Sequence, residues 1–200
     1  MTDFGILVVC TGNIARSAMG ERLMRAALDA EPDLVVTSAG TWGHEGSPME
    51  RNAAAALAEI GVDEGGFRAR ELTPAMIRDA SLVLTATREH RVAVLGHEPA
   101  ALRRTFTLRE FARLTAHTGG VIAEESSQPE RARGLVAAAA AARGAIRVAA
   151  TDDDVRDPYG SPLPVYRRCR DQIAAAVAAI AAGLMAPPRV SPADPKGTSS

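Results

Sequence analysis

The chain has 200 residues, of which 46% are hydrophobic and 24% charged, a composition that fits one globular domain with a hydrophobic core. The formal net charge of -1 gives no indication of a surface for nucleic acid or acidic membranes. The two cysteines exclude a disulfide framework, and the longest apolar run, residues 173–186, is too short to cross a bilayer. Since the N-terminus has no signal-peptide pattern, we expect a cytoplasmic protein without nucleic-acid or membrane partners.

The first element predicts the most about function. Residues 5–10 form an apolar strand typical of a parallel sheet, and a short polar loop leads to a helix over residues 17–30. In that loop five residues separate Cys10 from Arg16, with Gly12 between them. A loop that feeds a helix N-terminus offers unpaired backbone N–H groups to an anion, and Arg16 adds a planar fork for two phosphate oxygens. Cys10 would lie at the floor of this cup, where the positive field favours its thiolate.

A competing interpretation makes Cys10 an ordinary buried residue at the end of a strand. We favour the anion cup because the motif lies on a strand–loop–helix transition, with Ser17 directly after Arg16.

Strands and helices alternate along the rest of the chain. Further strands are predicted at residues 34–38, 81–85 and 104–108. Helices are predicted at residues 48–60, 73–80, 87–95, 108–115, 129–142 and 166–184. Such alternation predicts an α/β domain with a parallel sheet. Right-handed crossovers would place the first strand centrally, with its loop at the carboxyl edge, where these folds bind ligands.

The C-terminal half suggests how the domain is bounded. Residues 1–185 are expected to form one domain, in which residues 116–150 are a helical insertion on the surface. Residues 186–200 are rich in Pro, Ser, Asp and Gly, so we expect a disordered tail.

The segment 152–160 offers candidates for an acid. A thiolate that attacks phosphorus needs a partner to protonate the departing oxygen. Asp157 is distinguished by Pro158, which stiffens the chain beside it, and Tyr159 could line an aromatic pocket. On spacing alone a general acid at Asp157 competes with an ordinary turn residue. Residues 152–154 are interpreted as solvated loop charges.

Four segments of the chain occur in the order seen in low-molecular-weight protein tyrosine phosphatases: residues 10–17, 38–41, 88–90 and 157–159. The chain resembles this family over most of residues 5–183. The resemblance implies a three-layer α/β/α fold of the flavodoxin-like type, with a four-stranded parallel sheet. It also implies a reaction in two steps without a metal or other cofactor, on phosphotyrosine proteins. We expect a monomer or weak dimer.

The resemblance also implies roles for individual residues. Cys10 would form a cysteinyl-phosphate, Arg16 and the loop amides would hold the phosphoryl oxygens, and Asp157 would be the general acid and then the base. The other loop residues would shape the phosphate site: Thr11, Gly12, Asn13, Ile14, Ala15 and Ser17. Trp42 and Tyr159 would flank the aromatic ring of the substrate.

Departures from the family pattern qualify these roles. Ala15 stands where many members have a second Cys, so a protective disulfide in the loop should be absent. Phe67 stands where many members have a His that joins the Asn–Ser network. Trp42 lies one residue earlier, relative to the following His, than in many members. Ile14 replaces a small Thr typical of protein-arginine phosphatases, and its bulk favours an aromatic ester.

Two alternative functions remain open. Arsenate reductases share the fold and the loop, but the only downstream thiol, Cys169, lies on an apolar helix face, so a reductase would need an external small thiol. A non-catalytic phosphate-binding module is the other alternative. The loss of a His at Phe67 favours it, whereas retention of Cys10, Arg16 and Asp157 argues against it.

Overall fold

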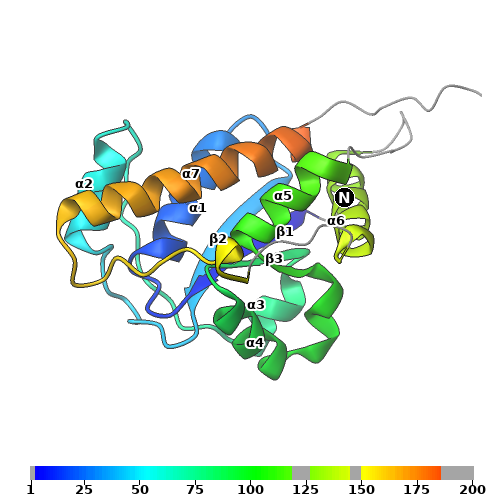
Figure 1. Cartoon of the computed structure of the whole chain (residues 1–200), viewed down its shortest axis with the longest axis horizontal. Helices are drawn as coiled ribbons and strands as arrows, with labels where there is room; N and C mark the ends of the chain where they lie inside the picture. Colours follow the sequence, from blue (N-terminus) through cyan, green and yellow to red (C-terminus); the bar gives the residue numbers. More distant parts are fainter. Residues whose placement is uncertain (1–2, 119–126, 145–149, 186–200) are drawn as a thin grey trace, which may run out of the picture.

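The computed structural model describes residues 3–118, 127–144 and 150–185 (Figure 1). The predicted four-stranded parallel sheet is confirmed, with the order β2-β1-β3-β4. Its strands are β1 (Phe4–Cys10), β2 (Leu34–Gly40), β3 (Leu82–Thr85) and β4 (Thr105–Thr107). As expected, β1 lies inside the sheet, where Cys10 pairs with Gly40 of β2 and Val9 with Thr85 of β3. Cys10 is therefore at the carboxyl edge, between two neighbouring strands.

Helices cover both faces of the sheet, which gives the predicted three layers (Figure 1). The helices are α1 (Arg16–Ala27), α2 (Arg51–Ala58), α3 (Pro74–Asp79), α4 (Arg88–His97), α5 (Leu108–Thr118), α6 (Gln128–Ala142) and α7 (Leu163–Met185), with 3₁₀ turns η1 (Pro99–Arg104) and η2 (Ala150–Asp153). Alternate residues of β1 serve the two faces. Phe4, Ile6 and Val8 contact the layer of α1, α2, α5 and α7, whereas Leu7 and Val9 contact α3, α4 and η1.

Several element boundaries differ from the predictions. The predicted helix 48–60 begins only at Arg51, because the Glu50 side chain accepts hydrogen bonds from the amides of Asn52 and Ala53 and so caps α2. Pro48 lies in the preceding loop rather than in the first turn. Thr73 and Thr87 cap α3 and α4 by the same kind of contact.

Helix α6 confirms the helix predicted over residues 129–142. It starts with a capping box, in which Ser127 and Glu130 satisfy one another's backbone amides. Its apolar residues Leu135 and Val136 are buried in the core shared by α5 and α7, so α6 is a part of that layer. Residues 119–126 and 145–149 of the predicted insertion, and the predicted tail 186–200, lie outside the described residues.

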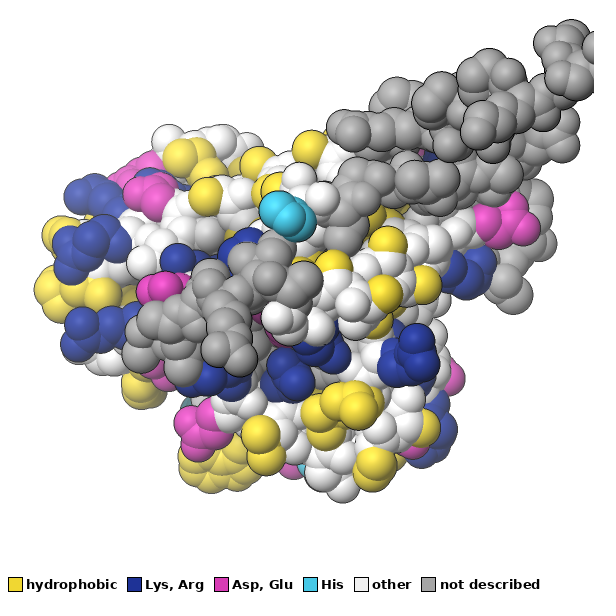
Figure 2. Space-filling model, turned by 45° about the vertical axis from the view of Figure 1, so that its right-hand side comes forward, with side chains coloured by type: hydrophobic (Ala, Val, Ile, Leu, Met, Phe, Trp, Pro, Cys, Tyr) yellow, Lys and Arg dark blue, Asp and Glu magenta, His cyan; other side chains and the backbone are white. Residues whose placement is uncertain are grey.

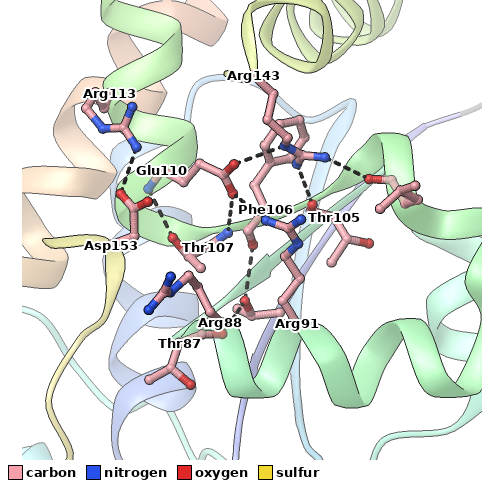
Figure 3. A network of polar contacts seen from close by, with 12 residues as sticks. Thr87, Arg88, Arg91, Thr105, Phe106, Thr107, Glu110, Arg113, Arg143 and Asp153 are labelled. Atoms are coloured by element: carbon pink, nitrogen blue, oxygen red, sulfur yellow. Dashed lines mark hydrogen bonds and ion pairs between the residues drawn. The ribbon is translucent and has the colours of Figure 1, made fainter. Parts of the chain in front are cut away.

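Glu110 joins the end of α6 to the edge of the sheet (Figure 3). It forms a capping box with Thr107 at the start of α5, and its buried carboxylate pairs with Arg91 of α4 and Arg143 directly after α6. The Arg143 guanidinium also lies 4.0 Å over the Phe106 ring and donates to the Thr105 carbonyl. Four elements therefore meet at one carboxylate.

On the face drawn in Figure 2, basic and acidic side chains are interspersed, in keeping with the net charge of -1. Within the described residues, no helix has both the length and the apolar character needed to cross a membrane.

Candidate active site

The loop after β1 turns its carbonyl groups outward. The carbonyls of Cys10, Thr11, Gly12 and Ile14 accept hydrogen bonds of 2.8 to 3.0 Å from the amides of Thr41, Trp42, His44 and Glu50. In a trans peptide the N–H group points away from the carbonyl of the same plane. Among the residues that the structure describes, none accepts a hydrogen bond from the amides of residues 11–15. These N–H groups, together with the N-terminus of α1, which no side chain caps, surround a cup suited to an anion.

Gly40 lets the second strand approach this loop closely. A Cβ atom at Gly40 would lie 2.3 Å from the Thr11 carbonyl oxygen and 2.9 Å from the Asn13 nitrogen. Only glycine fits there without moving the loop, so the carbonyl-out arrangement depends on Gly40.

Asn13 holds the loop from behind. Its backbone is left-handed, with φ of 53°, and its side chain is fully buried. Its amide nitrogen donates to the hydroxyls of Ser17 and Ser38, both at 2.8 Å, and its carbonyl oxygen accepts from the amide of Arg70 at 2.8 Å. Ser38 in turn donates to the buried Glu21. The side chain of Phe67 is buried and takes no part in this network, so the amide of Arg70 supplies the donor to Asn13.

Cys10 lies at the floor of the cup with 2% of its surface exposed. Its sulfur is 3.0 Å from the Ser17 hydroxyl. The Ser17 hydroxyl accepts from the Asn13 side chain, and its one proton faces two acceptors, the Cys10 sulfur and the Ala39 carbonyl at 3.4 Å. The Asn13–Ser17 pair therefore holds a hydroxyl within hydrogen-bond distance of the Cys10 sulfur.

Asp157 reaches the cup from the other end of the chain. Its Oδ2 accepts from Nη2 of Arg16 at 2.6 Å, across a sequence separation of 141 residues. Its Oδ1 accepts from the amide of Tyr159, which fixes the turn that contains Pro158. The guanidinium of Arg16 is buried, and the same Nη2 donates to the Thr11 hydroxyl at 3.3 Å.

The predicted site residues share one cavity of about 180 Å³. It is lined by Cys10, Thr11, Gly12, Ile14, Ala15, Arg16, Trp42, His44, Asp157 and Tyr159. The two predicted aromatic walls are largely exposed, Trp42 by 73% and Tyr159 by 65%. Asn13 and Ser17 are the predicted loop residues that do not line it, because they support the loop from below.

The segment that carries Asp157 is tied to α4 and α5. Asp153 pairs with Arg113 at 2.8 Å, and the Asp154 carboxylate accepts from the amide of Arg88 at 2.8 Å. Val155 then donates to the Ala86 carbonyl. The interpretation of Asp153 and Asp154 as solvated charges is therefore wrong, because both carboxylates have partners on helices. These partners, Arg113 and Arg88, are distant in the sequence.

His90 is a site residue for which the sequence predicted no contact. Its Nε2 lies 2.8 Å from the Thr11 hydroxyl and its Nδ1 lies 2.6 Å from the hydroxyl of Thr87. Burial, and then the charge of Arg16, lower the pKa of His90 to about 4, so its imidazole is neutral at physiological pH. The local feature of the sequence that points to the contact with Thr87 is its position, since Thr87 caps α4 three residues before His90.

Comparison with known proteins agrees with this geometry. Residues 5–124 match the family model described as low molecular weight phosphotyrosine protein phosphatase. The chain belongs to this family. It is 31% identical to a protein-arginine-phosphatase of Geobacillus stearothermophilus, over 85% of this chain and 88% of that protein. It is 42% identical to the low molecular weight protein-tyrosine-phosphatase Etp of Escherichia coli K12, over 53% of this chain and 70% of that protein.

The solved structures confirm the fold of this low-molecular-weight phosphatase. The YwlE arginine phosphatase from Geobacillus stearothermophilus superimposes with a TM-score of 0.65 at 29% identity, covering 89% of this chain and 90% of that one. The chain is therefore an enzyme of the phosphatase family, with Cys10 at the position expected of the family at the end of the first strand.

Two other kinds of chemistry, attack by a second thiol and metal binding, depend on Cys169 and on clusters of His, Cys, Asp and Glu. Cys169 is buried in α7, and burial raises its pKa to about 12, so it stays a thiol at neutral pH. Among residues 3–118, 127–144 and 150–185, no three His, Cys, Asp or Glu side chains are placed to hold a metal ion.

Proposed function

We propose that this phosphatase dephosphorylates phosphotyrosine in proteins through a cysteinyl-phosphate on Cys10. The observation that carries the proposal is the convergence of Cys10, Arg16 and Asp157 on one cavity beneath unpaired loop amides. A phosphate dianion in the cup would meet N–H donors and the guanidinium of Arg16 around its equatorial oxygens.

In the first step the thiolate of Cys10 forms a bond to phosphorus as the bond from phosphorus to the aryl oxygen breaks. Asp157, protonated in this step, gives its proton to the departing oxygen. In the second step the Asp157 carboxylate takes a proton from water as the water oxygen attacks phosphorus. The P–S bond breaks, which returns the Cys10 thiolate and releases inorganic phosphate.

The cavity walls favour an aromatic ester. Ile14, Trp42 and Tyr159 offer apolar surface to a phenyl ring. Asp157 is the only acidic residue among the lining residues, and it already contacts Arg16. The guanidinium of phosphoarginine would therefore have no carboxylate of its own. Phosphoarginine is the second candidate because a protein-arginine-phosphatase is 31% identical over 85% of the chain.

A substrate panel tests the choice. We expect a kcat/KM for a phosphotyrosine peptide about 100-fold or more above that for the matched phosphoarginine peptide. Both peptides should be assayed beside arsenate, with and without glutathione. The reverse preference would establish the second candidate, and thiol-dependent arsenate reduction alone would indicate a reductase. Tight phosphate binding without turnover would indicate a binding module.

Replacing Asp157 by Ala should give a rate loss that depends on the leaving group. Rates for phenyl phosphate, whose leaving oxygen is basic, should fall by about 10² to 10⁴, and rates for p-nitrophenyl phosphate by much less. The measurement is the slope of log kcat/KM against leaving-group pKa. Asp152→Ala, an exposed acid five residues away, is the control and should keep the wild-type slope. An equal loss on every ester would rule out proton donation by Asp157.

Family membership implies phosphoprotein substrates. We further propose that the enzyme is cytoplasmic, since a nucleophilic thiol requires a reducing environment. We also propose that it acts as a monomer or weak dimer.

A further inference from the structure

A second groove of about 400 Å³ lies beside the cavity just described. It runs between residues 156–161 and the N-terminal half of α7, along which this segment passes in Figure 1. Both the groove and the cavity are lined by Asp157, so the two are neighbours on one surface. A polypeptide whose phosphoester lies at Cys10 therefore has this groove beside it.

One wall of the groove is a stripe along α7. Val165, Arg168, Cys169 and Gln172 line it. Their spacing of three and four residues puts them on a single helix face. The opposite wall is formed by Arg156 and Ser161, and the Ser161 carbonyl is held by the side-chain amide of Asn52. Both walls are thus anchored to the fold.

The groove presents cations without counterions. Arg156 and Arg168 are exposed, and neither guanidinium forms a hydrogen bond or ion pair with any described residue. The arginines next to Arg168 on α7 are paired. Arg167 pairs with Glu59 at 2.5 Å, and Arg170 pairs with Glu59 and Asp171. The single acid of the groove, Asp157, is already in contact with Arg16.

An acidic side chain is the group that this surface fits. Guanidinium groups bind carboxylates through two parallel hydrogen bonds, and the Ser161 hydroxyl and the Gln172 amide add further donors. A basic side chain would meet two like charges there.

We propose that the groove binds a Glu or Asp that flanks the phosphorylated tyrosine, and so selects phosphoprotein substrates with an acidic neighbour. This inference rests on the proposed function. Arg168 is the specificity residue to test, because Arg156 is adjacent to Asp157 and a change there would disturb the acid as well.

The test compares phosphotyrosine peptides that differ only in having Glu, Ala or Lys beside the tyrosine, on each side in turn. For each enzyme, the kcat/KM of a peptide is divided by that for p-nitrophenyl phosphate, which is too small to reach the groove. We expect the wild type to prefer Glu over Lys by about 10-fold at low salt, and less at high salt. Arg168→Ala should reduce this preference to about threefold or less, and Arg168→Glu should abolish or invert it.

The matched control is Arg103→Ala. Arg103 is exposed in η1, which precedes β4 and so lies at the opposite edge of the sheet, and its removal changes the net charge equally. It should keep the wild-type preference. An unchanged preference in Arg168→Ala and Arg168→Glu, or no acidic preference in the wild type, would overturn the inference while p-nitrophenyl phosphate turnover upholds the proposed function. No turnover of p-nitrophenyl phosphate by the wild type would instead refute the proposed function, and the inference with it.

Discussion

Replacing Cys10 by Ser is expected to lower kcat for aryl phosphates by about 10⁴-fold or more. A serine hydroxyl at this position has no general base beside it, because the side chain hydrogen-bonded to the sulfur, that of Ser17, carries a hydroxyl, which is not a base at neutral pH. The change is nearly isosteric and should leave the loop amides and Arg16 in place. The variant should therefore bind inorganic phosphate with close to wild-type affinity while it turns over almost no substrate.

Two measurements on the Cys10→Ser protein separate catalysis from folding. Isothermal titration with phosphate reports whether the cup is intact, and the unfolding midpoint reports whether the buried position tolerates the oxygen. Turnover within tenfold of the wild type would contradict the assignment of Cys10 as the nucleophile. Loss of both phosphate affinity and thermal stability would show that Cys10→Ser damages the loop, and Cys10→Ala would then be the variant to compare.

Arg16→Lys is expected to lower kcat/KM by about 10³-fold, mostly through kcat. Lysine keeps the charge but loses the planar fork that can hold two phosphoryl oxygens at once. Because charge on the phosphoryl oxygens is redistributed in the transition state, the loss should exceed the change in phosphate affinity.

The matched control for Arg16→Lys is Arg25→Lys on the same helix. Arg25 pairs with Glu21 and its side chain is about half exposed, at 47%. We expect its kcat/KM to stay within about twofold of the wild type, because lysine keeps the positive charge beside Glu21 and Arg25 does not line the cavity. A loss below tenfold in Arg16→Lys, or a change in KM alone, would mean that Arg16 binds substrate without stabilising the transition state.

The sheet was predictable because its signals are local. The apolar run before Cys10 and the alternation of strands and helices each depend on neighbouring residues. The start of α2 was misplaced because Pro48 has the right backbone for a first turn, whereas the capping carboxylate of Glu50 lies two residues later. Two valid signals competed, and the hydrogen bonds to Glu50 decided between them.

The site was predictable only in part, for a related reason. The loop from Cys10 to Arg16 is one continuous pattern, so its chemistry could be inferred from the sequence. Asp157 lies 141 residues from Arg16, and a turn Asp before Pro has no local mark of an acid, so the resemblance to the family was needed to select it.

Contacts that depend on distant partners were missed. Asp153 looks solvated in the sequence because its partner, Arg113, is on another helix. His90 likewise contacts Thr11 of the phosphate loop, which lies 79 residues before it in the sequence. The helix over residues 129–142 could be predicted from its alanines, but its burial could not. That burial places Leu135 against Gly183 of α7, where a Cβ would lie 3.3 Å from the Leu135 side chain.

The central claim is that phosphate passes through the sulfur of Cys10. The most direct test mixes the wild-type enzyme with a phosphorus-labelled aryl phosphate, stops the reaction within one turnover in denaturant, and maps the labelled residue by mass spectrometry. We predict close to one phosphoryl group per enzyme, on Cys10, with a matching burst of phenol and no label in Cys10→Ala. A phosphate burst without protein-bound label, or label on any other residue, would contradict the account.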